Sequence, residues 1–132
     1  MNNSQELHHL FDELIASDKG TISINGSNIT VQLVDDANRM LCSTPVFNGG
    51  NYIPKSVRAC VDHPSPIRQS IRTQLEIDEE SFQVKLLYLG KVDYFDCKVV
   101  KGILHEFSNI AEEWRYYLDE HGRQDLVHVI AK

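Results

Sequence analysis

The sequence predicts an α+β fold in which a helix, an antiparallel three-strand meander, a broken helix and one or two further strands precede a long C-terminal helix packed on the sheet. Three observations predict this class. Apolar residues recur at three- and four-residue steps over 99–118, as on one face of a long helix. Two short runs rich in β-branched residues flank Asn25-Gly26, a strong tight-turn signal. At 132 residues the chain has the length of one domain, 1–132.

The first half of the chain predicts one helix and three strands. The helix is expected over 4–17, with Ser4 as its N-cap and Lys19-Gly20 at its C-terminal end. Strands are expected over 21–24, 28–34 and 39–46. Ser27 could lengthen the first turn beyond Asn25-Gly26. Loops this short join antiparallel neighbours, so the three strands form a meander.

The second half contains one ambiguous segment and one strong helix. Over 55–75 the apolar spacing favours helix, but Pro64 and Pro66 cannot lie in a helix interior. We therefore predict a short helical turn, a break at 63–66 and a helix over 66–74, with a strand over 73–77 competing for its end. A strand over 81–89 follows. The long helix is expected to begin at Asp93 or Asp96 and to stop at 121–122. The tail at 126–131 fits an added strand, a docked extension or a frayed end.

Charge, apolar patterning and cysteine spacing limit the classes of partner and the cellular location that we expect. The net charge is −6 and the isoelectric point is near 5.4, which disfavours direct binding to nucleic acid, because phosphate contacts need clustered Lys and Arg. The N-terminus has no basic region followed by an apolar run, and no apolar stretch has membrane-spanning length, so we expect neither a secretory signal nor a membrane partner. Three widely spaced cysteines fit a reducing compartment and a cytoplasmic location.

No pattern indicates catalysis, a metal or a cofactor. His8 and His9 are adjacent and would diverge on a helix, and His105 has no second ligand one turn away. The cysteines lack a neighbouring base, although Cys97 at the start of the long helix would be the most acidic thiol. We therefore predict no catalytic residues, no metal site and no cofactor.

Two surfaces could bind a partner. The long helix can cover a small sheet by itself, which leaves the first helix with least to bury against and makes it a candidate exposed surface. The chain has one basic patch, which is either solvated surface or a contact for an acidic partner: Lys55, Arg58, Arg68 and Arg72.

The order of elements, together with LEIDEESFQVKLLYLGKVDYFDCKVVKGILHEFSNIAEEWRYYL, resembles the small acidic type III secretion chaperones of the Tir-chaperone (CesT-like) family. In that family an acidic turn precedes a strand, and the last helix carries a characteristic ending. Here that ending is Phe107, Ile110, Ala111, Glu112, Trp114, Arg115 and Leu118. Small size and acidity agree with the family.

The resemblance implies a bacterial, virulence-associated export chaperone that works as a cytosolic dimer without cofactors. It would bind the N-terminal segment of a secreted effector or gatekeeper protein and keep it soluble and secretion-competent. An extended segment can add to a sheet edge while apolar pockets select its side chains. The alternative is a regulatory protein that binds RNA polymerase or a transcription factor. The cargo is expected on apolar residues of the first helix and the meander: Leu10, Leu14, Ile22, Ile24, Val31 and Leu33.

The resemblance also bears on assembly. Many family members have an uninterrupted second helix at the dimer interface, whereas Pro64 and Pro66 break this one. We expect a dimer, either with a second small chaperone or with a second copy of this chain. Clustered arginines oppose self-pairing across a two-fold axis, and an acidic partner would relieve that opposition. The expected interface residues are Val57, Val61, Ile67, Arg68, Ile71 and Arg72.

Overall fold

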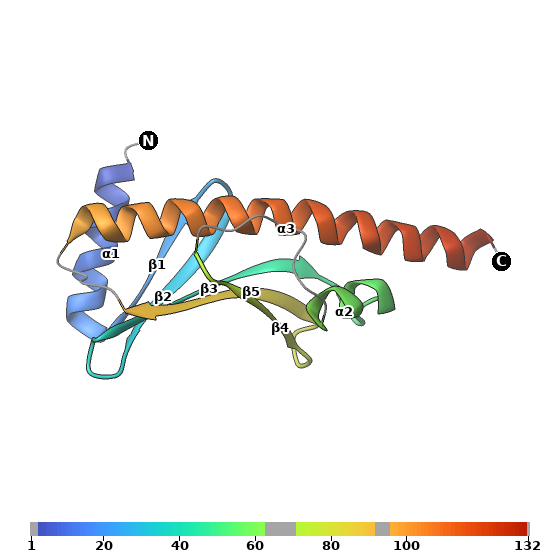
Figure 1. Ribbon diagram of the computed structural model, residues 1–132, viewed down its shortest axis with the longest axis horizontal. Coiled ribbons are helices and arrows are strands. Elements are labelled where there is room, and N and C mark those ends of the chain that lie inside the picture. The colour runs from blue at the N-terminus through green and yellow to red at the C-terminus, as the bar shows by residue number, and fades with distance from the viewer. Residues whose placement is uncertain (1–2, 63–70, 92–95, 132) are drawn as a thin grey trace.

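The strands of this chain form one antiparallel sheet, and α3 lies across it (Figure 1). The computed structural model describes residues 3–62, 71–91 and 96–131, with the side chains of 5–122 within those ranges. The strand order is β1-β2-β3-β5-β4. The predicted α+β class is confirmed. The elements are α1 (Asn3–Ser17), β1 (Lys19–Ile24), β2 (Ser27–Val34), β3 (Arg39–Asn48), α2 (Lys55–Asp62), β4 (Gln74–Asp78), β5 (Gln83–Lys91) and α3 (Cys97–Ala131).

The β1–β2 hairpin has the two-residue turn that Asn25-Gly26 predicts. Both residues have positive φ, 52° and 79°, as a type I′ turn requires. Ile24 pairs directly with Ser27, so Ser27 belongs to β2 and does not lengthen the loop. The turn also contacts α3, because the Asn25 side-chain amide donates to the Ser108 hydroxyl at 3.2 Å.

The end of α1 differs from the prediction. Asp18, with φ 62°, is the left-handed residue after the helix, and its backbone N–H donates to the Leu14 carbonyl at 2.9 Å. Gly20 lies in β1 instead. A Cβ at Gly20 would come within 2.9 Å of both the Glu13 Cβ and the Leu10 Cδ1. Gly20 therefore permits the close packing of α1 on β1 rather than ending the helix.

One face of the sheet is covered by α1 and α3 and forms the core. Along β1, β2 and β3 alternate side chains are buried, as expected for strands with one covered face. Burial of Leu7, Leu10 and Leu14 in this core shows that α1 is not an exposed helix, contrary to the expectation. The largest buried side chains from the long helix are Leu104, Phe107, Ile110, Trp114 and Leu118.

Helix α3 begins where Asp96 predicts and ends later than expected. The Asp96 carboxylate accepts hydrogen bonds from the backbone N–H groups of Lys98 and Val99, at 3.1 and 3.3 Å. Val99 was expected on the apolar face, but 46% of its surface is exposed. The predicted stop at 121–122 is wrong, since α3 continues to Ala131. A Cβ at Gly122 would lie 3.3 Å from the Phe47 ring, so this glycine allows the helix to pass close to β3.

The segment after β3 contains a short helix and a strand. The expected helical turn is α2, while the break at 63–66 and most of the helix expected over 66–74 lie outside the described residues. Gln74 begins β4, so the competing strand is confirmed and the helix does not extend to Gln74. Residues 81–82 belong to a turn, in which the Asp78 carboxylate accepts from the Ser81 backbone N–H at 3.4 Å, and β5 therefore begins at Gln83.

Candidate functional site

The six residues expected to contact cargo are all buried in the folded chain. Leu10, Leu14 and the four strand residues Ile22, Ile24, Val31 and Leu33 have exposed fractions of 0% to 7%. All six belong to the hydrophobic core between the sheet and the helices α1 and α3. Their side chains form the core of the monomer and offer almost no surface to a second molecule, so a contact on these elements needs other side chains.

The opposite face of the same sheet carries apolar side chains that neither α1 nor α3 covers. Leu41 pairs directly with Leu89, and Leu87 lies two residues before Leu89 on the same side of β5. Val34 lies diagonally across from Leu41. Leu89 is 45% exposed, and the other three are half-buried. We call these four residues the open sheet face. The signal in the sequence was the presence of leucines at 87 and 89, where a one-sided strand would have polar residues.

The two edges of the sheet differ in accessibility. Strand β1 forms one edge, where the Glu13 carboxylate of α1 accepts a hydrogen bond from the Thr21 backbone N–H at 3.4 Å. The start of β1 is therefore partly covered. Strand β4 forms the other edge and is only five residues long. Edge strands present unpaired backbone groups that an extended segment can use.

The residues expected at a dimer interface differ in how far they are buried. Val57 is fully buried, close to Gly122 of α3, and belongs to the monomer core. Val61 and Ile71 are half-buried and pack against that core, whereas Arg72 is exposed. Ile67 and Arg68 lie outside the described residues.

One member of the predicted basic patch already has an acidic partner within the chain. The Arg58 guanidinium donates two hydrogen bonds to the Glu79 carboxylate, at 2.9 and 3.1 Å. This contact raises the pKa of Arg58 and lowers the pKa of Glu79. Both side chains are exposed enough that water screens the pair, so it links α2 to the β4–β5 turn without adding much stability.

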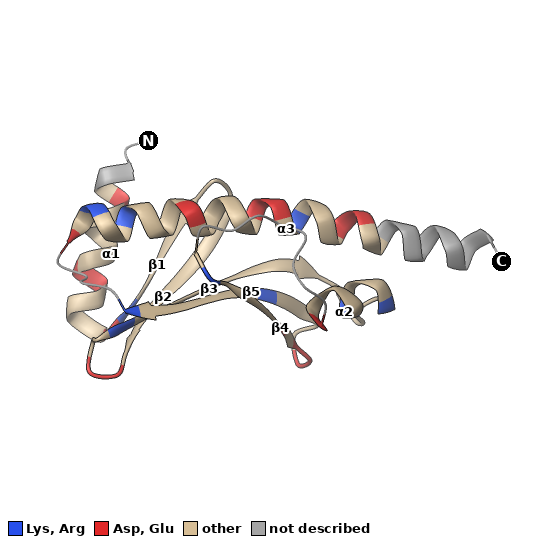
Figure 2. Ribbon diagram, in the orientation of Figure 1, with Lys and Arg blue, Asp and Glu red and all other residues tan. Residues whose placement is uncertain are grey.

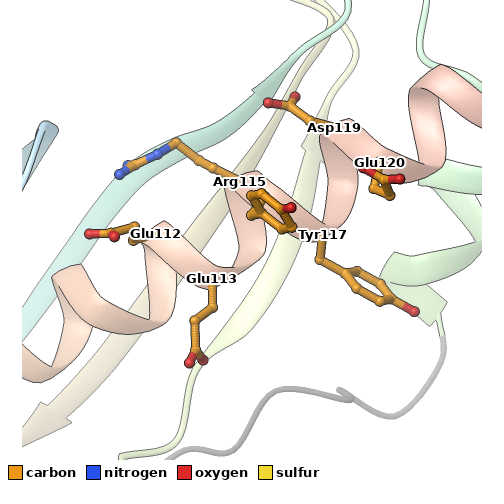
Figure 3. Close-up of a pocket in the computed structure, with 7 residues that line it drawn as sticks. Glu112, Glu113, Arg115, Tyr117, Asp119 and Glu120 are labelled. Carbon is orange, nitrogen blue, oxygen red and sulfur yellow. The ribbon is translucent and has the colours of Figure 1, made fainter.

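A hollow of about 660 Å³ lies along the outer side of α3 and is strongly acidic (Figure 3). Arg115 points away from Glu113 and Tyr117 in this view and is held at the hairpin, where it donates to the Ser27 hydroxyl and to the Asn25 carbonyl. Within the described ranges, Arg115 forms no ion pair with the carboxylates around the hollow. The residues that line the hollow are Glu112, Glu113, Arg115, Tyr116, Tyr117, Asp119 and Glu120.

The three thiols have different surroundings. Cys42 is buried, and burial raises the pKa of its thiol to about 12. Burial also raises the pKa of the half-buried Cys60 thiol. Cys97 is exposed at the start of α3. Because the thiolate is the reactive form, Cys42 is protected chemically as well as sterically.

Two classes of site are absent among the residues that the structure describes. No three His, Cys, Asp or Glu side chains of the described ranges gather in an arrangement that could hold a metal ion. Among the described helices, none combines the length and apolar character that a membrane span requires.

The fold also occurs in known complexes. No protein-family model matches the chain, and no curated protein matches its sequence. A chain in the crystal structure of the ExsC-ExsE complex matches it with a TM-score of 0.62 and 13% identity, over 87% of this chain and 94% of that one. A chain in the structure of the HopA1-SchA chaperone-effector complex matches with a TM-score of 0.52 and 13% identity, over 88% of this chain and 98% of that one. The chain shares their fold.

Proposed function

We propose that this protein is a cytoplasmic chaperone of type III secretion that binds the N-terminal segment of a secreted effector or gatekeeper protein and keeps it soluble and competent for export. The fold supports this proposal, because it is shared with a chain of a complex described as chaperone and effector. The apolar open sheet face supports it as well, since a chaperone needs apolar surface that its own core does not use.

The open sheet face is the surface that we propose for the cargo. Leu41, Leu87 and Leu89 form one apolar cluster on two paired strands, so a single extended segment could contact all three. The edge strand β4 pairs with β5 next to this cluster, with Gln74 opposite Leu87. A segment that adds to β4 lies one strand away from β5, so it could cross from this edge onto the open sheet face and reach the leucines there. This moves the proposed contact from the buried side of the meander to its uncovered side.

For assembly, we propose a dimer that uses the surface next to α2. Val61 and Ile71 are half-buried apolar residues of this region, and exposed Arg72 follows Ile71 in the chain. Light scattering is expected to show a dimer, alone or with a small acidic chaperone. Arg72→Glu is expected to weaken a mixed dimer, and so is high salt. A monomer that binds no other chaperone would contradict the dimer.

The experiment that tests the proposed function is capture from the native cytosol followed by identification of the bound proteins. The expected result is a secreted protein whose N-terminal segment alone, made as a fragment, binds the purified chain. Leu89→Asp serves as the variant that should release it, and Ile15→Asp, also at an exposed apolar position, serves as the matched control. Recovery of RNA polymerase subunits without any secreted protein would contradict an export function.

A further inference from the structure

Helix α1 crosses the beginning of α3 (Figure 1). The two helices line a small groove of about 240 Å³. We call it the α1–α3 groove. It lies on the helical side of the sheet, away from the open sheet face, and no residue of the proposed cargo or dimer surfaces lines it. Its lining consists of Leu7, His8 and Phe11 from α1 with Cys97, Lys98 and Lys101 from α3.

The groove combines an apolar base with a cationic rim. Leu7 is buried and Phe11 is half-buried, so they provide the base. Lys98 and Lys101 lie one turn apart on α3, and both are exposed. His8 on α1 is exposed as well. Among the described residues, neither lysine forms an ion pair with a carboxylate within 4 Å. Asp96, directly before α3, is the acid nearest to Lys98 in the sequence, and its carboxylate already accepts two backbone hydrogen bonds as the helix cap.

The charge along α3 changes sign. Figure 2 shows basic residues at the start of the helix and acidic residues further along it. The acidic hollow at 112–120 would repel a negatively charged segment, and so would the net charge of −6. Opposite charge steers a partner to a surface and fixes where it docks. An acidic segment approaching this protein would therefore be directed to the α1–α3 groove.

From this geometry we infer that the α1–α3 groove binds an acidic segment of the secreted partner that carries an aliphatic or aromatic side chain. The apolar side chain enters between Leu7 and Phe11, and flanking carboxylates face Lys98 and Lys101. This inference rests on the proposed function for the identity of the partner. It adds a second contact, of different chemistry, to the contact at the open sheet face.

The test uses a blocked ten-residue peptide of alternating Glu and Leu as the probe. Calorimetry is expected to show saturable binding to the wild-type chain and affinity about tenfold weaker for the double variant Lys98→Glu/Lys101→Glu. The variant Lys19→Glu/Lys91→Glu makes the same change in net charge at exposed positions elsewhere and is expected to bind as wild type. Peptides of alternating Lys and Leu, or of Glu and Ser, are expected to bind far more weakly. The first lacks carboxylates to face the lysines, and the second lacks apolar side chains to enter the groove.

Cys97 provides a readout of location. Bound Glu/Leu peptide is expected to slow the reaction of Cys97 with N-ethylmaleimide and to leave the reaction of Cys60 unchanged, as measured by mass spectrometry of peptides. Equal affinity for the Lys/Leu peptide, no protection of Cys97, or unchanged affinity in the lysine variant would each overturn the inference. Light scattering that showed loss of self-association in that variant would overturn it too, by assigning the groove to a second copy.

The same variant separates this inference from the proposed function. If the Lys98→Glu/Lys101→Glu protein captures a secreted protein with unchanged affinity, the groove is not a cargo site but the export function stands. If neither wild type nor variant captures a secreted protein, the export function fails.

Discussion

Replacing Trp114 by alanine is expected to lower the free energy of unfolding by about 3–5 kcal/mol, because the indole is 2% exposed and its removal leaves a cavity between α3 and the sheet. The ring also contacts Tyr117 edge to face, with ring centroids 5.7 Å apart, and this contact is lost as well. Denaturant unfolding followed by circular dichroism measures the change, since the variant no longer contains a tryptophan for fluorescence.

The matched control lies two residues away on the same helix. Tyr116 is 78% exposed, and Tyr116→Ala is expected to change the free energy of unfolding by no more than about 0.5 kcal/mol. Equal effects of the two substitutions would show that α3 does not pack on the sheet through Trp114. An unfolding midpoint unchanged by Trp114→Ala would make Trp114 a surface residue.

The second large effect is expected from Leu10→Asp. Leu10 is completely buried between α1 and β1, close to Gly20, so aspartate would place an unpaired charge in the core. We expect a loss of at least about 4 kcal/mol, enough to unfold many domains of this size. The sequence predicts Leu10 as a cargo contact, whereas its burial makes stability the property that this substitution changes most.

Ile15→Asp is the control for Leu10→Asp, because it makes the same kind of change on the same helix. Ile15 is 71% exposed, and its substitution is expected to cost no more than about 1 kcal/mol. Thermal unfolding and far-ultraviolet circular dichroism distinguish the two variants. A folded Leu10→Asp protein of near-normal stability would show that α1 is not part of the core.

Local chemistry predicted most of the fold. Asn25-Gly26 determined a turn whose two positive φ values few other residues adopt, and Asp96 capped α3 as expected. Gly122 predicted the wrong helix end, because glycine usually ends helices, whereas here it avoids the tight contact of 3.3 Å that a Cβ would make with the Phe47 ring. That distance depends on tertiary packing, which local propensity does not contain. Over 73–77 the pairing of β4 with β5 decided between helix and strand.

The candidate site was harder to predict than the fold. Alternation in β1 and β2 identified which side chains share a face, but it could not tell which face the helices cover. The sequence predicts an exposed surface on the first helix, whereas Leu10 and Leu14 pack into the core. Leu87 and Leu89 could have been recognised as surface, since they interrupt the polar positions of β5. The α1–α3 groove joins residues 90 positions apart, which no local pattern connects.

If the open sheet face binds the N-terminal segment of a secreted protein, a charge placed on that face should weaken the complex. Calorimetric titration of the N-terminal fragment, once captured and identified, into wild type, Leu89→Asp and Ile15→Asp measures this effect. We expect affinity at least about tenfold weaker for Leu89→Asp, with stability close to wild type, and wild-type affinity for Ile15→Asp. Wild-type affinity in a folded Leu89→Asp protein would contradict binding of the segment at the open sheet face.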